Sequence, residues 1–227
     1  MKDYGFPDAS HYLSLAKATV ECIRNQREVW TENNEFCSSI DQLFNQLLNK
    51  KATGFQFNGI LCSIIDKHEH NVRVGGKVEF SQGELQEQSY WIEVFGKKDS
   101  GYSSKILYRI HFDVAVPGID KNKELHPVYH VQLGGKTRDA NYIDDEIQHW
   151  SIPRIPYFPL SLALFLEIVF REFGGKLVRD RFIKSNGWRK IVAKNERRML
   201  GAFVNTFRNV SSETMSGIYY EGFREKA

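Results

Sequence analysis

The order of apolar and polar positions along the chain predicts helices at both ends and a sheet between them. Toward the N-terminus, apolar residues recur every three or four positions, which is the period of a helix with one buried face. We expect a first helix capped by Ser10 and a second that begins at Ser39, where Gln42 completes a capping box. From residue 57 the period becomes two, which predicts strands at 57–65, 77–80, 89–95, 105–116 and 128–133.

Helical periodicity returns in the last third of the sequence. Segment 159–173 is apolar on nearly every side, so we expect a central helix that packs on the apolar face of the sheet. A long final helix is predicted at 188–208. The connections between the predicted strands are short, which favours an antiparallel meander. The fold class is therefore α+β in a single domain, with N-terminal helices (1–52), an antiparallel sheet of about five strands (53–135), a linker (136–158) and a helical subdomain (159–227).

The strand alternation also gathers reactive side chains on the polar face of the predicted sheet. In strand 105–116 the even-numbered positions are apolar, so the polar positions point to the other face. If strands that are neighbours in sequence are also neighbours in the sheet, the polar positions of three strands meet on one side. The candidate catalytic residues on this face are Glu93, Arg109, His111, Asp113 and His130.

These residue types support two kinds of chemistry, beside a purely structural role. Histidines and carboxylates bind divalent metals such as Zn²⁺ or Mn²⁺. They also cleave RNA by general acid–base catalysis, with Arg109 stabilising the developing phosphate charge. The simpler interpretation is a sheet face whose polar residues face water or pair across strands. The sequence contains no HExxH, GxSxG or GxxxxGK[S/T] motif, so no cofactor is predicted, although a divalent metal suits these side chains.

Charge is distributed unevenly along the chain. The net charge of the 227 residues is +3, but segment 170–227 alone has 13 Lys and Arg against 6 Asp and Glu. Five cations of the predicted final helix gather on the side opposite its apolar residues: Lys190, Lys194, Arg197, Arg198 and Arg208. Such a row suits the phosphate backbone of a nucleic acid. The alternatives are pairing with an acidic protein partner, pairing with the acidic loop 144–146, and plain solvation.

Cysteine usage and apolar stretches bear on the compartment. Three widely spaced cysteines form no CxxC pair, which is typical of reduced thiols in a cytoplasmic protein. The N-terminus lacks the apolar core of a signal peptide, and the most apolar stretch, 160–170, is shorter than a membrane span. We therefore expect a cytoplasmic protein without a membrane partner.

Three segments resemble a family of bacterial proteins of unknown function, some of whose genes lie near phage-defence or mobile-element genes. They are the motif HPVYHVQLGG at 126–135, the motif IPRIP at 152–156 and the apolar helix at 159–173. The resemblance implies a bacterial cytosolic setting and a role associated with defence. It assigns no catalytic residue.

The sequence thus predicts a nucleic-acid-interacting accessory component of a bacterial anti-phage defence or mobile-element system. Its expected partners are DNA or RNA, or an acidic protein encoded in the same operon. One alternative is a nuclease or toxin-like phosphodiesterase that uses the residues of the polar sheet face. Another is a protein-binding module whose basic face docks an acidic partner.

Overall fold

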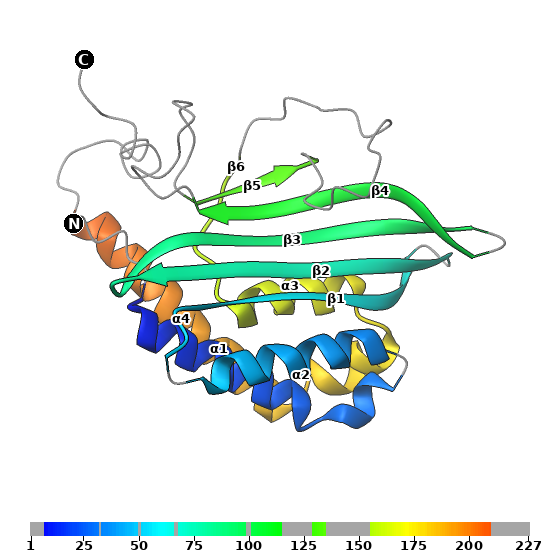
Figure 1. Cartoon of the computed structure of the whole chain (residues 1–227), viewed down its shortest axis with the longest axis horizontal. Helices are drawn as coiled ribbons and strands as arrows, with labels where there is room; N and C mark the ends of the chain where they lie inside the picture. The colour runs from blue at the N-terminus through cyan, green and yellow to red at the C-terminus, as the bar shows by residue number, and fades with distance from the viewer. Residues whose placement is uncertain are drawn as a thin grey trace, which may run out of the picture.

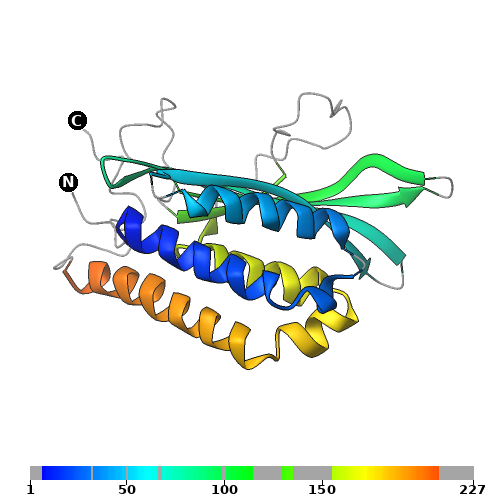
Figure 2. The same cartoon turned by 60° about the horizontal axis from the view of Figure 1, so that its bottom comes forward.

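The computed structural model describes residues 7–31, 33–49, 51–65, 68–98, 101–114, 129–134 and 155–209. Within these residues, one antiparallel sheet forms one layer of the molecule, and the helices pack against one of its two faces (Figure 1). The predicted α+β class is confirmed. The last helix, α4 (Asn186–Asn209), lies farthest from the sheet, beyond α1 (Ala9–Arg24) and α3 (Leu162–Phe173) (Figure 2).

The strands follow one another in the sheet in their sequence order, each antiparallel to the next. The predicted meander is therefore confirmed, and residues of the predicted linker add a short last strand. The strands are β1 (Gly54–Ile65), β2 (His68–Ser81), β3 (Glu84–Lys98), β4 (Gly101–Val114), β5 (Tyr129–Leu133) and β6 (Ile155–Pro156).

β2 is much longer than the strand predicted at 77–80. The prediction was too short because two glycines interrupt the apolar alternation of β2. A Cβ added to Gly75 would lie 2.2 Å from the ring of Trp91, and one added to Gly76 would lie 2.3 Å from the ring of Tyr90. The glycines make room for aromatic rings of β3. They also remove the side chains from which a strand is predicted.

The apolar alternation of β4 breaks near its first half. Val94 of β3 pairs with Tyr108, whereas the next residue, Phe95, pairs with Ile106, so the register shifts by one residue. Such a bulge turns the flanking side chains relative to the regular pleat. Ile106 and Phe95 are buried outside the main core cluster, which contains Phe112. Strict alternation predicts Ile106 on the same face as Phe112. In the structure Ile106 instead lies with Phe95.

Both N-terminal helices begin earlier than predicted. The N-cap of α1 is Asp8, whose Oδ1 accepts a hydrogen bond from the backbone nitrogen of His11 at 3.0 Å. Ser10, the predicted cap, instead donates its hydroxyl to Asp8 at 2.7 Å. The second helix, α2 (Asn34–Leu48), starts five residues before Ser39, and a single 3₁₀ turn, η1 (Arg27–Trp30), precedes it.

α3 is the central helix that the sequence predicts. Ser161 caps it by accepting a hydrogen bond from the nitrogen of Leu164 at 3.3 Å. Phe165 is fully buried and stacks on Tyr90 of β3, with 4.7 Å between ring centroids and 10° between ring planes. The expected packing of segment 159–173 on the apolar sheet face is thus confirmed.

Aromatic residues fix the start of α4. A π-helical turn, η2 (Val178–Phe182), connects α3 to this helix. Trp188 packs on Phe182 with 4.8 Å between ring centroids, and its Nε1 donates to Glu167 of α3 at 2.5 Å. Ser185 caps α4 by accepting from the nitrogen of Trp188 at 3.2 Å. The helix begins at Asn186, two residues before the predicted start at 188.

One buried cluster joins the two ends of the chain through the sheet. It contains Ile23 of α1, Val74 of β2, Phe165 of α3 and Met199 of α4. No helix in the described ranges is long and apolar enough to cross a membrane. Residues 136–154 of the predicted linker (136–158) and residues 210–227 lie outside the described residues.

Candidate functional site

The strand register brings the candidate catalytic residues to one face of the sheet. Glu93 of β3 lies opposite Arg109 of β4, and Asp113 of β4 lies opposite His130 of β5. His111 lies between Arg109 and Asp113 at the same parity of β4, so it shares their face. The strand order on which this alignment depends is observed. Catalysis by these residues stays a prediction.

Most of these side chains are buried, although the helices cover the other face. The exposed fraction is 1% for Arg109, 5% for Glu93 and His130, and 9% for His111. Of the two structural interpretations, solvation and cross-strand pairing, the burial fits cross-strand pairing. Buried polar groups need such partners, because an unpaired charge in the interior is costly.

Glu93 is the centre of a buried ionic cluster. Its Oε1 accepts from Arg109 Nε at 2.9 Å, and its Oε2 accepts from Arg73 Nη1 at 3.3 Å. Arg73 also lies over the ring of Phe95, 5.0 Å from its centroid. Both carboxylate oxygens thus face guanidinium groups. In this arrangement Glu93 holds two arginines in place, which is a structural role that the sequence interpretation also allowed.

Arg73 is a member of this face that the sequence analysis missed. It precedes the predicted strand 77–80, and the two glycines after it hide the alternation. Its position opposite Glu93 follows from the full length of β2. Extending the predicted strand toward the N-terminus through Gly75 places Arg73 on the same face as Lys77, and so on the polar face of the sheet.

Asp113 and His130 border a small cavity. The carboxylate of Asp113 accepts a hydrogen bond from the hydroxyl of Ser89. Asp113 and His130 line a cavity of about 10 Å³, which holds about one water molecule. Tyr90 and Tyr157 are among its other lining residues. Ligand sites usually measure about 300–1,000 Å³. Among the described residues no group of three or more His, Cys, Asp and Glu is arranged to hold a metal ion.

A hydrogen-bonded group of side chains lies at the same end of the sheet and was not predicted. The hydroxyls of Tyr12 and Tyr90 are 2.6 Å apart, and Gln88 Nε2 donates to Tyr12 at 3.0 Å and to the carbonyl of Leu160. Burial raises the pKa of the Tyr12 hydroxyl well above its ordinary value. The group ties α1 to β3 and to the segment before α3, so its role is structural.

The basic side of α4 is the most exposed of the predicted sites. The buried side of this helix consists of Trp188, Val192, Asn195 and Met199, which recur at intervals of three and four residues. The opposite side carries four cations that are all exposed: Lys190, Lys194, Arg197 and Arg198. We call these four residues the α4 basic face. Arg208 belongs to the same helix, but its side chain lies outside the described residues.

One residue of α4 differs from the predicted helical wheel, and the burial of another was not predicted. Asn195 is buried, 1% exposed, and donates its Nδ2 to the carbonyl of Ile191 at 2.9 Å. Leu200, which the wheel placed on the apolar arc, is 37% exposed. The buried arc is therefore narrower than predicted, and it leaves more of the helix surface to the cations.

Little negative charge neutralises the α4 basic face. Glu196 is the only acidic residue of the helix, and no described carboxylate forms an ion pair with Lys190, Lys194 or Arg198. Arg197 Nε donates to the carbonyl of Ala193 at 3.3 Å. The preceding segment adds exposed Arg179 and Arg181. The acidic loop 144–146, the proposed internal partner, lies outside the described residues.

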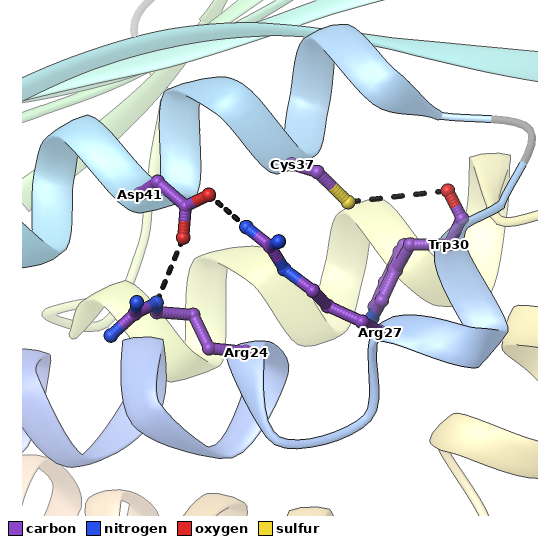
Figure 3. Close-up of polar contacts among 5 residues, drawn as sticks. All are labelled: Arg24, Arg27, Trp30, Cys37 and Asp41. Atoms are coloured by element: carbon purple, nitrogen blue, oxygen red, sulfur yellow. Dashed lines mark hydrogen bonds and ion pairs between the residues drawn. The ribbon is translucent and has the colours of Figure 1, made fainter.

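A second group of basic residues, at the end of α1 and in η1, pairs with one carboxylate of α2 (Figure 3). Asp41 accepts from Arg24 Nε at 2.8 Å and from Arg27 Nη2. Beside them the thiol of Cys37 points to the carbonyl of Trp30, with 4.0 Å between sulfur and oxygen. Burial raises the pKa of this thiol, which disfavours the reactive thiolate. This cluster is a structural joint between the helices.

Comparison with known proteins found no family model, no curated protein and no solved structure that matches this chain. Function is therefore argued from the geometry above.

Proposed function

We propose that this protein binds nucleic acid through the α4 basic face, as an accessory component of a bacterial anti-phage defence or mobile-element system in the cytoplasm. The observation that supports binding is a set of four exposed cations on a helix whose other side is anchored in the core. The bacterial and defence setting rests on the resemblance of segments 126–135, 152–156 and 159–173 alone.

The dimensions of the α4 basic face suit a phosphate backbone. From Lys190 to Arg198 the helix advances about 12 Å, at about 1.5 Å per residue. One strand of a duplex carries a phosphate about every 3.4 Å of its axis, so about three to four phosphates fit this length. Phosphate contacts of this kind position a protein on nucleic acid without reading its sequence.

The anchoring of α4 favours a fixed binding surface over a loose cationic segment. Trp188 is fully buried at the start of the helix, and Met199 is fully buried about three turns after Trp188. Because the backbone is held at both points, the cations keep their spacing without a partner. A preorganised surface loses less conformational entropy on binding.

An acidic protein partner would use the same surface. The binding experiment must therefore distinguish a protein partner from nucleic acid. Nucleic acid binds with a steep dependence on salt concentration, because phosphate contacts release condensed counterions. A protein partner would be retained after nuclease treatment. Retention of nucleic acid and persistence of a protein complex after nuclease are therefore separate outcomes.

The experiment compares charge reversal on the α4 basic face with a control reversal elsewhere. Labelled short DNA and RNA are mixed at low salt with the wild type, with Lys194→Glu/Arg197→Glu/Arg198→Glu, and with Lys51→Glu, an exposed lysine between α2 and β1. We expect retention by the wild type and the control, and loss in the triple variant. Failure of the wild type to retain either nucleic acid overturns the proposal.

A further inference from the structure

The two edges of the sheet are protected in different ways. β6 is two residues long and contains Pro156, and both features discourage pairing with another chain. β1, at the opposite edge, is twelve residues long and contains neither a charged residue nor a proline. Its sequence therefore lacks the usual protection of an edge strand.

Side chains of α2 occupy the position of a neighbouring strand along part of β1. Gln46 Nε2 donates to the carbonyl of Gln56 at 2.9 Å, and Gln46 Oε1 accepts from the nitrogen of Gln56 at 3.0 Å. About two turns earlier on α2, Ser39 donates its hydroxyl to the carbonyl of Asn58 at 2.5 Å. A peptide strand paired with β1 would make the same two bonds to Gln56. The carboxamide of Gln46 thus replaces a strand.

The local geometry shows why this replacement works. A Cβ on Gly59 would lie 3.2 Å from Phe36 and from Ser39, so glycine lets α2 approach the strand closely. On its other side Gln46 borders a cavity of about 440 Å³, which Gly54 and Gln56 also line. The side chain is exposed and has open space beside it, so it can turn away from the edge.

We propose that the edge of β1 from Gly54 to Asn58 is a strand-pairing surface for a second copy of this chain, and that Gln46 and Ser39 keep it closed. A second copy fits because antiparallel pairing of β1 with β1 is self-complementary about a two-fold axis. The strand carries no charge, so two copies do not repel each other there. Pairing would join two sheets edge to edge.

The test removes the carboxamide and measures molar mass by light scattering across a dilution series. We expect Gln46→Ala to move from 26.4 kDa toward twice this mass as concentration rises. Gln42→Ala is the matched control, because Gln42 is an exposed glutamine of the same helix with no hydrogen bond to the described strands. A Gln46→Ala protein that keeps the monomer mass throughout overturns the proposal.

A second substitution identifies the surface involved. The main-chain groups of Asn58 point away from β2, so proline there removes an outward donor without breaking the β1–β2 ladder. We expect Asn58→Pro to return Gln46→Ala to the monomer mass. If Asn58→Pro dissociates a dimer of the wild type, the edge is already open and the proposal is wrong.

Hydrogen exchange of the Gln56 amide provides a local readout in the same samples. In dilute Gln46→Ala we expect this amide to exchange at least about tenfold faster than in the wild type, with protection returning at high concentration. Exchange that does not depend on concentration contradicts the proposal. Should Gln46→Ala not fold, Ser39→Ala opens the Asn58 end alone, and the same two measurements apply to it.

Discussion

Neutralising Glu93 tests how the polar face of the sheet is built. Glu93→Gln keeps the size and shape of the side chain but removes its charge. Arg109, 1% exposed, would then keep a buried positive charge without the carboxylate that lies 2.9 Å from its Nε. Arg73 would lose the same partner, but its side chain is 14% exposed and water screens part of its charge.

The magnitude follows from this burial. Removing one partner of a buried ion pair costs about 3–5 kcal/mol, mainly because the remaining charge is left uncompensated. Domains unfold with free energies of about 5–15 kcal/mol, so the loss is a large fraction of the total. At about 2–4 °C per kcal/mol for a chain of this length, the melting temperature should fall by about 6–20 °C.

The assay is urea unfolding followed by tryptophan fluorescence and by circular dichroism. The control is Glu79→Gln, because Glu79 pairs with Lys77 at 3.0 Å but is 53% exposed, and we expect it to cost less than about 1 kcal/mol. Replacing all three charges together, Glu93→Leu with Arg109→Met and Arg73→Met, should restore most of the stability, because no buried charge of the cluster then lacks its partner. A loss below about 1 kcal/mol for Glu93→Gln would refute the buried pair and return Glu93 to the catalytic candidates.

Three further predictions concern the N-cap, the buried tyrosines and the catalytic alternative. Asp8→Ala should lower the free energy of unfolding by about 1 kcal/mol. Hydrogen bonds from Ser10 and from the nitrogen of His11 lower the pKa of Asp8, so its contribution is full above the unfolded pKa of about 4 and is lost as pH falls through the lower folded pKa. A stability difference between wild type and variant that stays constant into acid would contradict this. Burial raises the pKa of Tyr12 and of Tyr90, so stability should fall as pH rises above the unfolded pKa of about 10, and tyrosinate absorbance from these two should appear only with unfolding; titration in the folded protein would be the contrary result. If the polar face is a nuclease site, His111→Ala and His130→Ala should each abolish RNA degradation seen with the wild type, and equal behaviour of all three proteins would end the catalytic alternative.

The strongest apolar patterns predicted the fold well. α3 was predicted as a central helix because segment 159–173 is apolar on nearly every side, and most of its apolar residues are buried, whereas Arg171 and Glu172 face out at its end. The N-cap of α1 was misplaced because Asp8 and Ser10 are both good caps, and only the observed bonds decide between them. In β2 the signal failed at Gly75 and Gly76, since their role is to leave space for rings on another strand.

The candidate sites depended on information that lies between strands. The sequence gives the parity of Arg109 and Asp113, but not the register that sets Glu93 opposite Arg109. Burial of this face was not predictable from alternation, because alternation separates two faces without showing which is covered. On α4 the side chains of Lys190, Lys194, Arg197 and Arg198 are exposed, and their binding role stays a prediction, whereas the wheel did not show that Asn195 would be buried.

The salt dependence of binding tests the central claim most directly. If the four residues of the α4 basic face each contact one phosphate, the logarithm of the binding constant for duplex should fall with the logarithm of salt concentration with a slope of about −3.6. Reversal of Arg197 and Arg198 to Glu removes two contacts and should reduce the slope to about −1.8. A slope near zero for the wild type, or a slope that these reversals leave unchanged, would contradict the proposed nucleic-acid interface.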